Sequence, residues 1–362
     1  MSERVLFKRV YRAHTVFAFG GLYTTPMIIF FAIGASILVV VAVIGITGNS
    51  LVIVAMAVSR KLQTITNVFV LSLSVTDLLT CALLPFQSLG LVHPAGWPLN
   101  HTFCQVVGAS VYISTITSVL TLALIAFNRY YLITRRPADY QWLYKPFRLC
   151  LMLAVAWFQS ILCLLVPEVV NIETLGYSSE QRWCSWLSKE DPVGIYESIA
   201  FVNIFFSFLL IIFCYVKILM WVRQQQQVLA QSDVAPTSVV TANRPAEPSE
   251  MPGQDQTSDR PHGFDAAPKK EVRKRASQIN MNLFFVVCAF FLCVMPHSLC
   301  VLTPGHEIPS IYTFILMSVN CCINPLIYAQ KHPHFKQVFR ALLRCKYNDI
   351  PHPSSWIRVF LE

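Results

Sequence analysis

One acidic side chain lies deep within a long apolar segment. Asp77 stands near the middle of the apolar run 66–92. An ionised carboxylate at bilayer depth is costly unless a cation or hydrogen-bonding partners compensate its charge. The simpler alternative is a protonated, hydrogen-bonded Asp77. Oxygen and amide groups on other apolar runs would suit a small hard cation such as sodium, and these candidates are Asn49, Ser118, Asn320 and Asn324.

A second motif, Asn128-Arg129-Tyr130, closes the apolar run 104–132. The guanidinium of Arg129 could simply extend to the membrane surface on its apolar stem. It could instead offer its planar five-donor fork to the backbone end of a docked partner helix. The second interpretation places a protein-binding site at this end of the run.

A third motif, Asn324-Pro325-x-x-Tyr328, interrupts the run 309–330. Proline removes a backbone hydrogen bond and kinks a helix, and the asparagine can satisfy the groups that are freed. The kink is either passive or a moving element, and its nearness to the predicted position of Asp77 favours movement.

Seven continuous apolar blocks must position these residues. The 362-residue chain is 55% hydrophobic and 13% charged, whereas soluble domains carry roughly 25% charged residues. Each block can cross a bilayer, which takes about 20 residues per helix. We therefore predict an all-α, seven-transmembrane-helix bundle with no cofactor. The blocks are 28–58, 66–92, 104–132, 147–167, 194–222, 277–302 and 309–330.

The basic residues predict how the bundle is oriented. Of the 28 lysines and arginines, 21 lie in the segments 59–64, 129–148, 223–275 and 331–362. The positive-inside rule makes these segments cytoplasmic. We expect a multi-pass protein of the cell membrane with its N-terminus outside and its C-terminus inside, although four basic residues within 1–27 oppose this bias.

The same division predicts three parts of the chain. Residues 1–27 form an extracellular tail, 28–330 the seven-helix domain and 331–362 a cytoplasmic tail. Within the helical domain, 223–275 is rich in Gln, Pro, Ser, Asp and Glu and reads as a disordered cytoplasmic loop. It ends in a basic cluster, 269–275, which suits an anionic membrane surface, a protein partner or both.

Most of the twelve cysteines lie inside apolar blocks, where they act as small hydrophobic residues. Cys104 and Cys184 lie instead on the predicted outer side, which is an oxidising compartment. We predict that they form a disulfide. Asn100 fits a glycosylation sequon on the same side.

In their order and spacing, the landmarks of the whole chain resemble those of rhodopsin-like (class A) G-protein-coupled receptors. Phe335 follows at the position expected for a short cytoplasmic amphipathic helix, and Cys345 is a candidate for palmitoylation. The Asn-Arg-Tyr variant is a faint hint of melatonin-type receptors. The landmarks are Gly48, Asn49, Leu73, Asp77, Trp97, Cys104, Arg129, Tyr130, Trp157, Tyr215, Phe290, Pro296, Asn324, Pro325 and Tyr328.

The resemblance implies a ligand-operated switch. An extracellular ligand would bind the outer half of the bundle, and Arg129, Tyr215 and Tyr328 would rearrange to accept a heterotrimeric G protein. Sodium at Asp77 would favour the resting state, so that agonist and sodium would oppose each other. Further partners would be the lipid bilayer, arrestin and a receptor kinase.

Four positions depart from the family pattern, and two of them remove a restraint on Arg129. Asn128 replaces the usual acidic residue before the arginine, and Ala276 stands where some members carry a glutamate that also holds it. Val294 replaces the usual tryptophan of helix six, and Ser207 a common proline of helix five. Since two restraints on Arg129 are missing, we expect elevated basal signalling.

The family positions also predict the ligand. Val111 replaces the aspartate that pairs with amine ligands, which argues against an amine. Ser318 replaces the retinal-binding lysine of opsins, which argues against an opsin. The inferred pocket is largely neutral, which suits a neutral or weakly polar small molecule such as an indoleamide or a lipid. A peptide gripping Glu168, Glu173, Glu180 or Asp191 is the alternative. The pocket residues are Gln87, Tyr112, Thr115, Asn203, His297, Phe314 and Ser318.

Other functional classes fit less well. A transporter would need several charges within the membrane and matched halves, yet Asp77 is the only acidic residue deep in a predicted span. An enzyme would need metal ligands or paired carboxylates at suitable spacing, which the histidines do not provide. We expect neither catalysis nor nucleic-acid binding. A constitutively active receptor of the same fold remains a further alternative.

Overall fold

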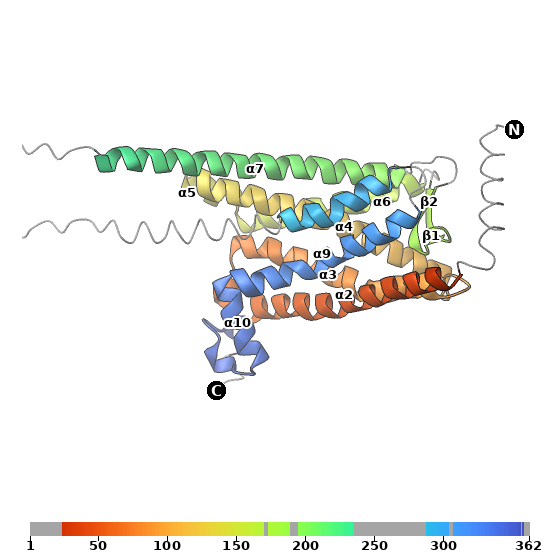
Figure 1. The fold of residues 1–362 in the computed structure, drawn as a ribbon. Coiled ribbons are helices and arrows are strands. Elements are labelled where there is room, and N and C mark those ends of the chain that lie inside the picture. The colour runs from red at the N-terminus through yellow and green to blue at the C-terminus, as the bar shows by residue number, and fades with distance from the viewer. Residues whose placement is uncertain are drawn as a thin grey trace, which may run out of the picture.

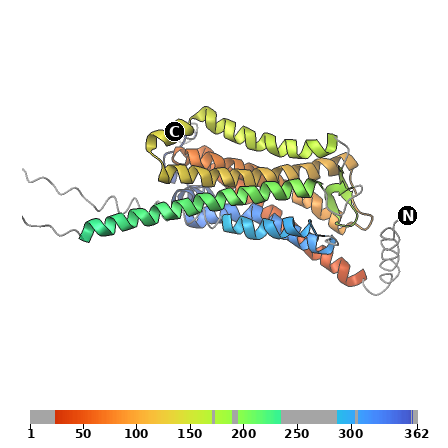
Figure 2. The same ribbon diagram turned by 90° about the horizontal axis from the view of Figure 1, so that it is seen from above.

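The computed structural model describes residues 24–169, 173–188, 195–234, 287–303, 307–355 and 357. Long helices lie side by side along one direction and form an elongated bundle (Figures 1 and 2). Six of the described helices are long and apolar enough to cross a membrane. A further apolar helix, Val287–Cys300, is shorter. The six long helices are α2 (Thr24–Val58), α3 (Ile65–Val92), α4 (His101–Thr134), α6 (Pro146–Val169), α7 (Ile195–Val234) and α9 (Glu307–Lys331).

Shorter elements mark the two ends of the bundle. The strands β1 (Glu173–Ser178) and β2 (Trp183–Ser188) pair as an antiparallel hairpin at one end, the hairpin end. The helix α10 (Pro333–Leu343) lies at the opposite end, the α10 end (Figure 1). Three further short elements are the 3-10 helix η1 (Arg60–Leu62), the helix α5 (Pro137–Leu143) and the 3-10 helix η2 (Tyr347–Asp349).

The seven-helix prediction is confirmed, but the fifth helix ends later than expected. The fifth apolar block was expected to end at 222, whereas α7 continues to Val234 through the polar residues that follow. Residues 223–234 therefore belong to a helix and not to the predicted disordered loop. A helix satisfies its own backbone, so it need not end where its apolar residues end. The rest of that loop, the basic cluster 269–275 and Ala276 lie outside the described residues.

Local sequence sets where helices begin. The Thr64 hydroxyl accepts a hydrogen bond from the Asn67 backbone N–H at 3.3 Å and caps α3. The Asn100 side chain does the same for α4, accepting from the Thr102 N–H at 2.7 Å. Short polar side chains at these positions supply the acceptors that the first turn of a helix lacks. The sequon asparagine Asn100 is therefore also a helix cap.

The helices are apolar both on the surfaces that face one another and on the surfaces that face outward. The inner surfaces of α2, α3, α4, α7, α9 and α10 share one large buried cluster, to which Tyr144 and Phe290 also belong. Large apolar side chains such as Phe147 and Phe158 point outward and are 79% and 67% exposed. An apolar outer surface is what a bilayer requires.

A close approach of α2 and α9 brings the first and last spans together. A Cβ atom built on Gly48 would lie 2.8 Å from the Cβ of Pro325. A side chain at position 48 would therefore push α9 away at its proline. The predicted amphipathic helix is also present, because α10 buries Phe335, Val338 and Phe339 on one face.

Candidate functional site

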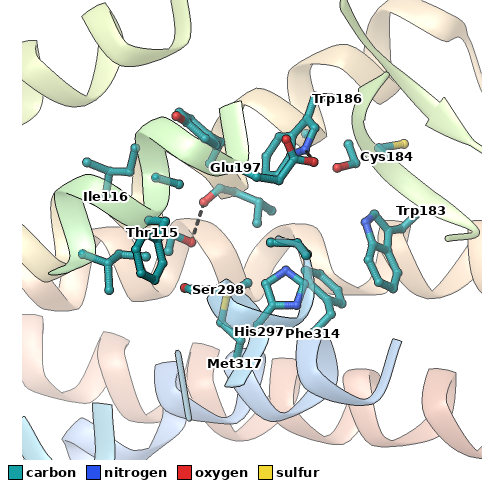
Figure 3. Close-up of a pocket in the computed structure, with 18 residues that line it drawn as sticks. Thr115, Ile116, Trp183, Cys184, Trp186, Glu197, His297, Ser298, Phe314 and Met317 are labelled. Atoms are coloured by element: carbon teal, nitrogen blue, oxygen red, sulfur yellow. Dashed lines mark hydrogen bonds between the residues drawn. The ribbon is translucent and has the colours of Figure 1, made fainter. Parts of the chain in front are cut away.

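A cavity opens at the hairpin end, among α4, β2, α7, α9 and the helix Val287–Cys300 (Figure 3). Most of its wall is apolar or aromatic, which is the usual character of a small-molecule site. Its lining residues are Gly108, Val111, Tyr112, Thr115, Ile116, Trp183, Cys184, Ser185, Trp186, Glu197, Ala200, Phe201, Ile204, His297, Ser298, Val301, Phe314 and Met317.

Four of the seven predicted pocket residues line this cavity: Tyr112, Thr115, His297 and Phe314. The hydroxyl of Tyr112 donates to the Tyr196 carbonyl oxygen at 3.3 Å. The Nδ1 atom of His297 lies 3.1 Å from the Thr313 hydroxyl, and Phe314 stacks on Trp183 with ring centres 4.5 Å apart. The ring of His297 is thus held by a neighbour while it also faces the cavity.

The other three predicted pocket residues lie elsewhere. Gln87 is buried and bonds both the N–H and the carbonyl of Cys184, at 2.8 and 3.0 Å. Asn203 accepts from Gln159 at 2.6 Å and lines a separate groove between α4, α6 and α7. Ser318 donates to the Phe314 carbonyl and lines a second, smaller cavity that Asp77 also lines. The family positions alone do not indicate that these side chains are already hydrogen-bonded to other groups of the protein.

Glu197 was not among the predicted pocket residues, and it adds a carboxylate to a pocket that was expected to be largely neutral. Glu197 lies in the first turn of α7, is 7% exposed, and accepts a hydrogen bond from the indole N–H of Trp186. Both side chains line the cavity (Figure 3). The only indication of this carboxylate in the sequence is that Glu197 lies three positions inside the apolar block 194–222.

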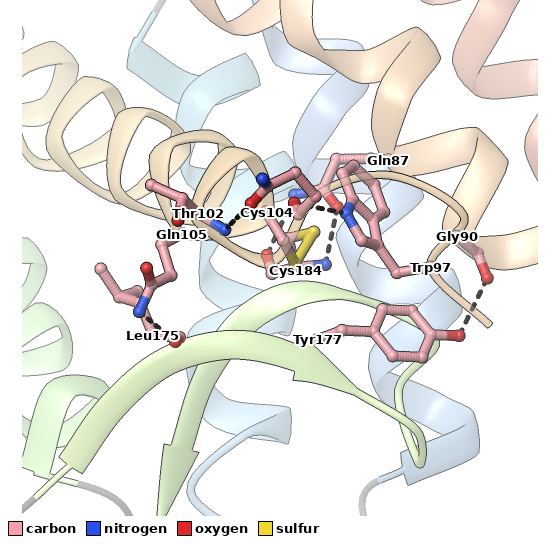
Figure 4. The surroundings of a disulfide bond; sticks show 10 residues. Gln87, Gly90, Trp97, Thr102, Cys104, Gln105, Leu175, Tyr177 and Cys184 are labelled. Atoms are coloured by element: carbon pink, nitrogen blue, oxygen red, sulfur yellow. Dashed lines mark hydrogen bonds between the residues drawn. A yellow bond between two sulfur atoms is a disulfide. The ribbon is translucent and has the colours of Figure 1, made fainter.

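The predicted disulfide between Cys104 and Cys184 is present and anchors the hairpin over α4 (Figure 4). A Cβ on Gly108 would lie 3.3 Å from the Cys184 carbonyl oxygen, so a small residue allows this close contact. The Tyr177 hydroxyl also donates to the Gly90 carbonyl at 3.0 Å. The disulfide and these contacts hold Trp183 and Trp186 of β2 over the cavity.

A polar core lies deeper in the bundle. Asp77 is 1% exposed, and the Asn324 amide donates to its carboxylate at 2.8 Å. Ser118 and Asn320 line the same small cavity as Asp77. Asn49 bonds the Cys321 carbonyl at 2.9 Å and does not line that cavity. The structure therefore brings Asp77, Ser118, Asn320 and Asn324 together and leaves Asn49 beside them.

The polar core has the chemistry of a hard-cation site. The Ser114 hydroxyl lines its cavity and has no hydrogen-bond partner among the described residues. Carboxylate, hydroxyl and amide oxygens are ligands for sodium-like ions. Within the described part of the chain, no three His, Cys, Asp or Glu side chains are grouped to hold a metal.

The motif Asn128-Arg129-Tyr130 lies near the α10 end, with its three side chains in different surroundings. Asn128 is fully buried, accepts from the Thr66 hydroxyl at 2.8 Å and donates to the Tyr140 hydroxyl at 3.1 Å. Tyr130 instead accepts from Arg135 at 3.0 Å. Arg129 lies within electrostatic reach of three phenols, those of Tyr140, Tyr215 and Tyr328.

Comparison with known proteins identifies the family. The model of the seven-transmembrane receptors of the rhodopsin family matches residues 48–328, most of the chain. The chain belongs to this family. The receptor is similar to the G-protein coupled receptor moody of Drosophila melanogaster, with 27% identity over 84% of the chain, and spans about half of that protein's length.

Other relatives and one solved structure agree. The octopamine receptor beta-2R of Chilo suppressalis is 26% identical over 88% of the chain and 81% of its own length. The alpha-1D adrenergic receptor of Mus musculus is 28% identical, over 83% of the chain and 55% of its own length. Squid rhodopsin superposes with a TM-score of 0.67, covering 89% of this chain and 90% of its own at 19% identity. The class A resemblance is confirmed, and the matched proteins are receptors and not enzymes. The melatonin-type hint stays a prediction.

The remaining predicted residues of the receptor are distributed as follows. Phe290 is buried and contacts Phe208, with ring centres 6.1 Å apart. Pro296 lies within the helix Val287–Cys300 and Pro325 within α9. The phenol oxygen of Tyr328 is buried with no hydrogen-bond partner among the described residues. Cys345 is exposed just after α10.

Proposed function

We propose that this receptor converts the binding of an extracellular ligand into activation of a cytoplasmic heterotrimeric G protein. The observation that carries the proposal is an ordered arrangement along one bundle. A cavity lies at the hairpin end, the polar core around Asp77 lies deeper, and Arg129 lies towards the α10 end. The proposed orientation places the hairpin outside the cell and α10 inside, in line with the basic residues of the connectors.

The proposed ligand is a neutral or weakly polar small molecule that fills the cavity beneath Trp183 and Trp186. The mainly apolar and aromatic lining supports this choice. Val111 also lines the cavity and offers no charge to a ligand. The Glu197 carboxylate adds one strong acceptor, so we expect the ligand to carry at least one N–H or O–H donor.

A basic amine is the second candidate ligand, because Glu197 supplies a carboxylate from α7 where α4 has only Val111. Aromatic rings beside a carboxylate favour a cation through both charge and cation–π attraction. The relatives named above include octopamine and adrenergic receptors. A peptide ligand remains the alternative outside the cavity; Glu168, Glu173 and Glu180 are described, and Asp191 is not.

The deciding experiment measures second messengers for every G-protein class in transfected cells, with and without ligand probes. The probes are N-acetyltryptamine and tryptamine, a neutral and a cationic form of one ring system. In Glu197→Gln, a neutral ligand should keep its potency within about threefold, whereas an amine should lose about tenfold or more with its ion pair. Glu180→Gln, in the exposed turn of the hairpin, is the matched control.

Absence of any response in every pathway, with and without the probes and with surface expression proven, would contradict both the expected basal signalling and a ligand of the tryptamine type. Equal loss for both probes in Glu197→Gln would instead contradict the distinction between the two ligand classes, because it would reveal a structural role. Silence in every pathway and an equal loss for both probes are therefore distinguishable outcomes.

Further proposals concern regulation. Sodium at Asp77 would bind as an allosteric ion, held by the oxygens of the polar core. Asn100 would carry a glycan and Cys345 a palmitoyl group. Arrestin and a receptor kinase would act at the α10 end, which is the proposed cytoplasmic side.

A further inference from the structure

The chain beyond α10 turns back and binds the end of the first long helix, α2. Ser59, directly after α2, forms an isolated antiparallel bridge with Pro353. The Ser59 hydroxyl donates to the Pro351 carbonyl at 2.7 Å, and the Arg60 N–H donates to the His352 carbonyl at 2.9 Å. We call residues 350–355 the clasp.

The clasp caps α2. The last carbonyls of a helix have no partner within the helix, and a glycine or a local polar group often satisfies them. Here Ser354 does so across 297 positions of sequence. Its hydroxyl donates to the Ala57 carbonyl at 2.7 Å, and its N–H donates to the Val58 carbonyl at 2.8 Å.

Burial and strain show that the clasp is a packed contact. Ser354 is 4% exposed, and Ile350 and Ile357 are buried in the same apolar cluster as Val58 and Leu62. His352 holds a positive φ of 50°, a backbone conformation that is strained for a non-glycine residue. The hydrogen bonds and the buried isoleucines must offset this strain, so the balance between closed and open tail is sensitive to the loss of one contact.

Ser354 is the point at which a charge would open this contact. Its hydroxyl oxygen lies against the Ala57 carbonyl oxygen at the C-terminal end of α2, which carries the partial negative charge of the helix dipole. A phosphoryl group there would be repelled, and its bulk would not fit a buried site. The neighbouring Ser355 is exposed, so the same charge at that position has no such effect.

We propose that the clasp is a releasable cap on α2 and that Ser354 is the modification site that holds it open. A protein kinase would transfer the terminal phosphoryl group of ATP. A bond forms between phosphorus and the Ser354 oxygen, the bond to ADP breaks, and the hydroxyl proton is lost. Since the hydroxyl is buried when the clasp is closed, the kinase can act only on the open tail, and the phosphate then prevents its return.

Arg60 and Lys61 are exposed next to the clasp and provide the competing possibility. Basic side chains bind phosphate, so they could draw a charged Ser354 inward and tighten the clasp. The contact of the Ser354 hydroxyl with the Ala57 carbonyl favours opening, and the experiment must separate the two directions.

Hydrogen–deuterium exchange of the full-length receptor in lipid nanodiscs tests the proposal. The reporters are the peptides that contain the Arg60 and Ser354 amides, which cross the contact. In Ser354→Glu these amides should exchange about tenfold or more faster, the effect of leaving buried polar groups unpaired. Ser355→Glu is the matched control and should equal the wild type.

Neutral variants keep the test independent of one charged substitution. Ser354→Ala and Ser59→Ala each remove one hydrogen bond of the contact, and each should accelerate the same amides by roughly three- to tenfold. Unchanged exchange in the α4 peptides shows that the bundle remains folded. Slower exchange in Ser354→Glu, equal effects of the two glutamates, or no effect of either alanine would overturn the proposal.

Discussion

Replacing Asn128 by aspartate should lower ligand-independent signalling of the receptor. Asn128 stands where the family usually carries an acidic residue that restrains the adjacent arginine. The structure shows that the asparagine is engaged instead with Thr66 and Tyr140, through neutral hydrogen bonds. Arg129 is therefore held without a neighbouring carboxylate on its own helix.

The size of the expected fall in ligand-independent signalling follows from the contacts that Asn128→Asp keeps and the charge that it adds. An aspartate at position 128 can still accept from Thr66, and the Tyr140 hydroxyl can reverse its role and donate. Both contacts survive, so the net change is one negative charge at the residue before the half-buried Arg129. A pair of a buried carboxylate and the Arg129 guanidinium should, after the cost of burying the carboxylate, stabilise the resting state by about 1–2 kcal/mol, which corresponds to a five- to thirtyfold lower ratio of active to resting receptor.

Second-messenger readouts without ligand, at matched surface expression, provide the assay. Thr66→Val is the control, because it removes one hydrogen bond of Asn128 without adding charge. We expect Asn128→Asp to fall well below the wild type and Thr66→Val to remain at or above it. Equal basal signalling in the wild type and Asn128→Asp would refute the reasoning, and an equal fall in both variants would assign the effect to packing.

Two further predictions concern groups that titrate or bind ions. Asp77→Asn should abolish stabilisation by sodium while keeping the contact with Asn324. The assay is thermal unfolding after sodium chloride replaces N-methylglucamine chloride. With sodium at about five to thirty times its Kd, the wild type should gain about 1–2 kcal/mol of stability and the variant none. An equal sodium effect in both proteins would move the ion site elsewhere. Burial, with the charges of His334 and Arg129, lowers the pKa of His332 from 6.5 to about 4. Its imidazole caps α10 by accepting from the Phe335 N–H, so the neutral form stabilises the folded state. This stabilisation, roughly 3 kcal/mol at most, is complete above pH 6.5 and is lost as the pH falls towards 4. Hydrogen exchange of α10 should accelerate over that window in the wild type and much less in His332→Asn, which keeps a capping acceptor; identical pH profiles would contradict this.

The spans were predictable because the bilayer imposes a simple rule on sequence. The apolar blocks 66–92 and 147–167 correspond within a few residues to α3 and α6. The contact between Asp77 and Asn324 was predictable as well, because a lone carboxylate at that depth requires a partner. In both cases the surroundings leave the sequence few alternatives.

Contacts that depend on tertiary packing were not predictable in this way. Gln87 has the right helix and depth for a ligand contact, yet the hairpin backbone at Cys184 uses both ends of its amide. Glu197 was overlooked because it lies near the end of an apolar block, where a charged residue is unremarkable. The capping of α2 by Ser354 joins segments almost 300 positions apart, and no local pattern announces it.

The proposed ligand cavity and the polar core share part of their walls, which gives a physical route between them. Val111, Thr115 and Met317 line both spaces. Val294 and Phe290 complete the wall of the polar core from the helix Val287–Cys300, at the level where the family usually places a tryptophan. A ligand that displaces Met317 would therefore change the space around Asp77 directly. Because valine fills less volume than tryptophan, Val294 leaves the adjoining side chains more freedom to repack, and this agrees with the loosened resting state that Asn128 predicts at the opposite end of the bundle.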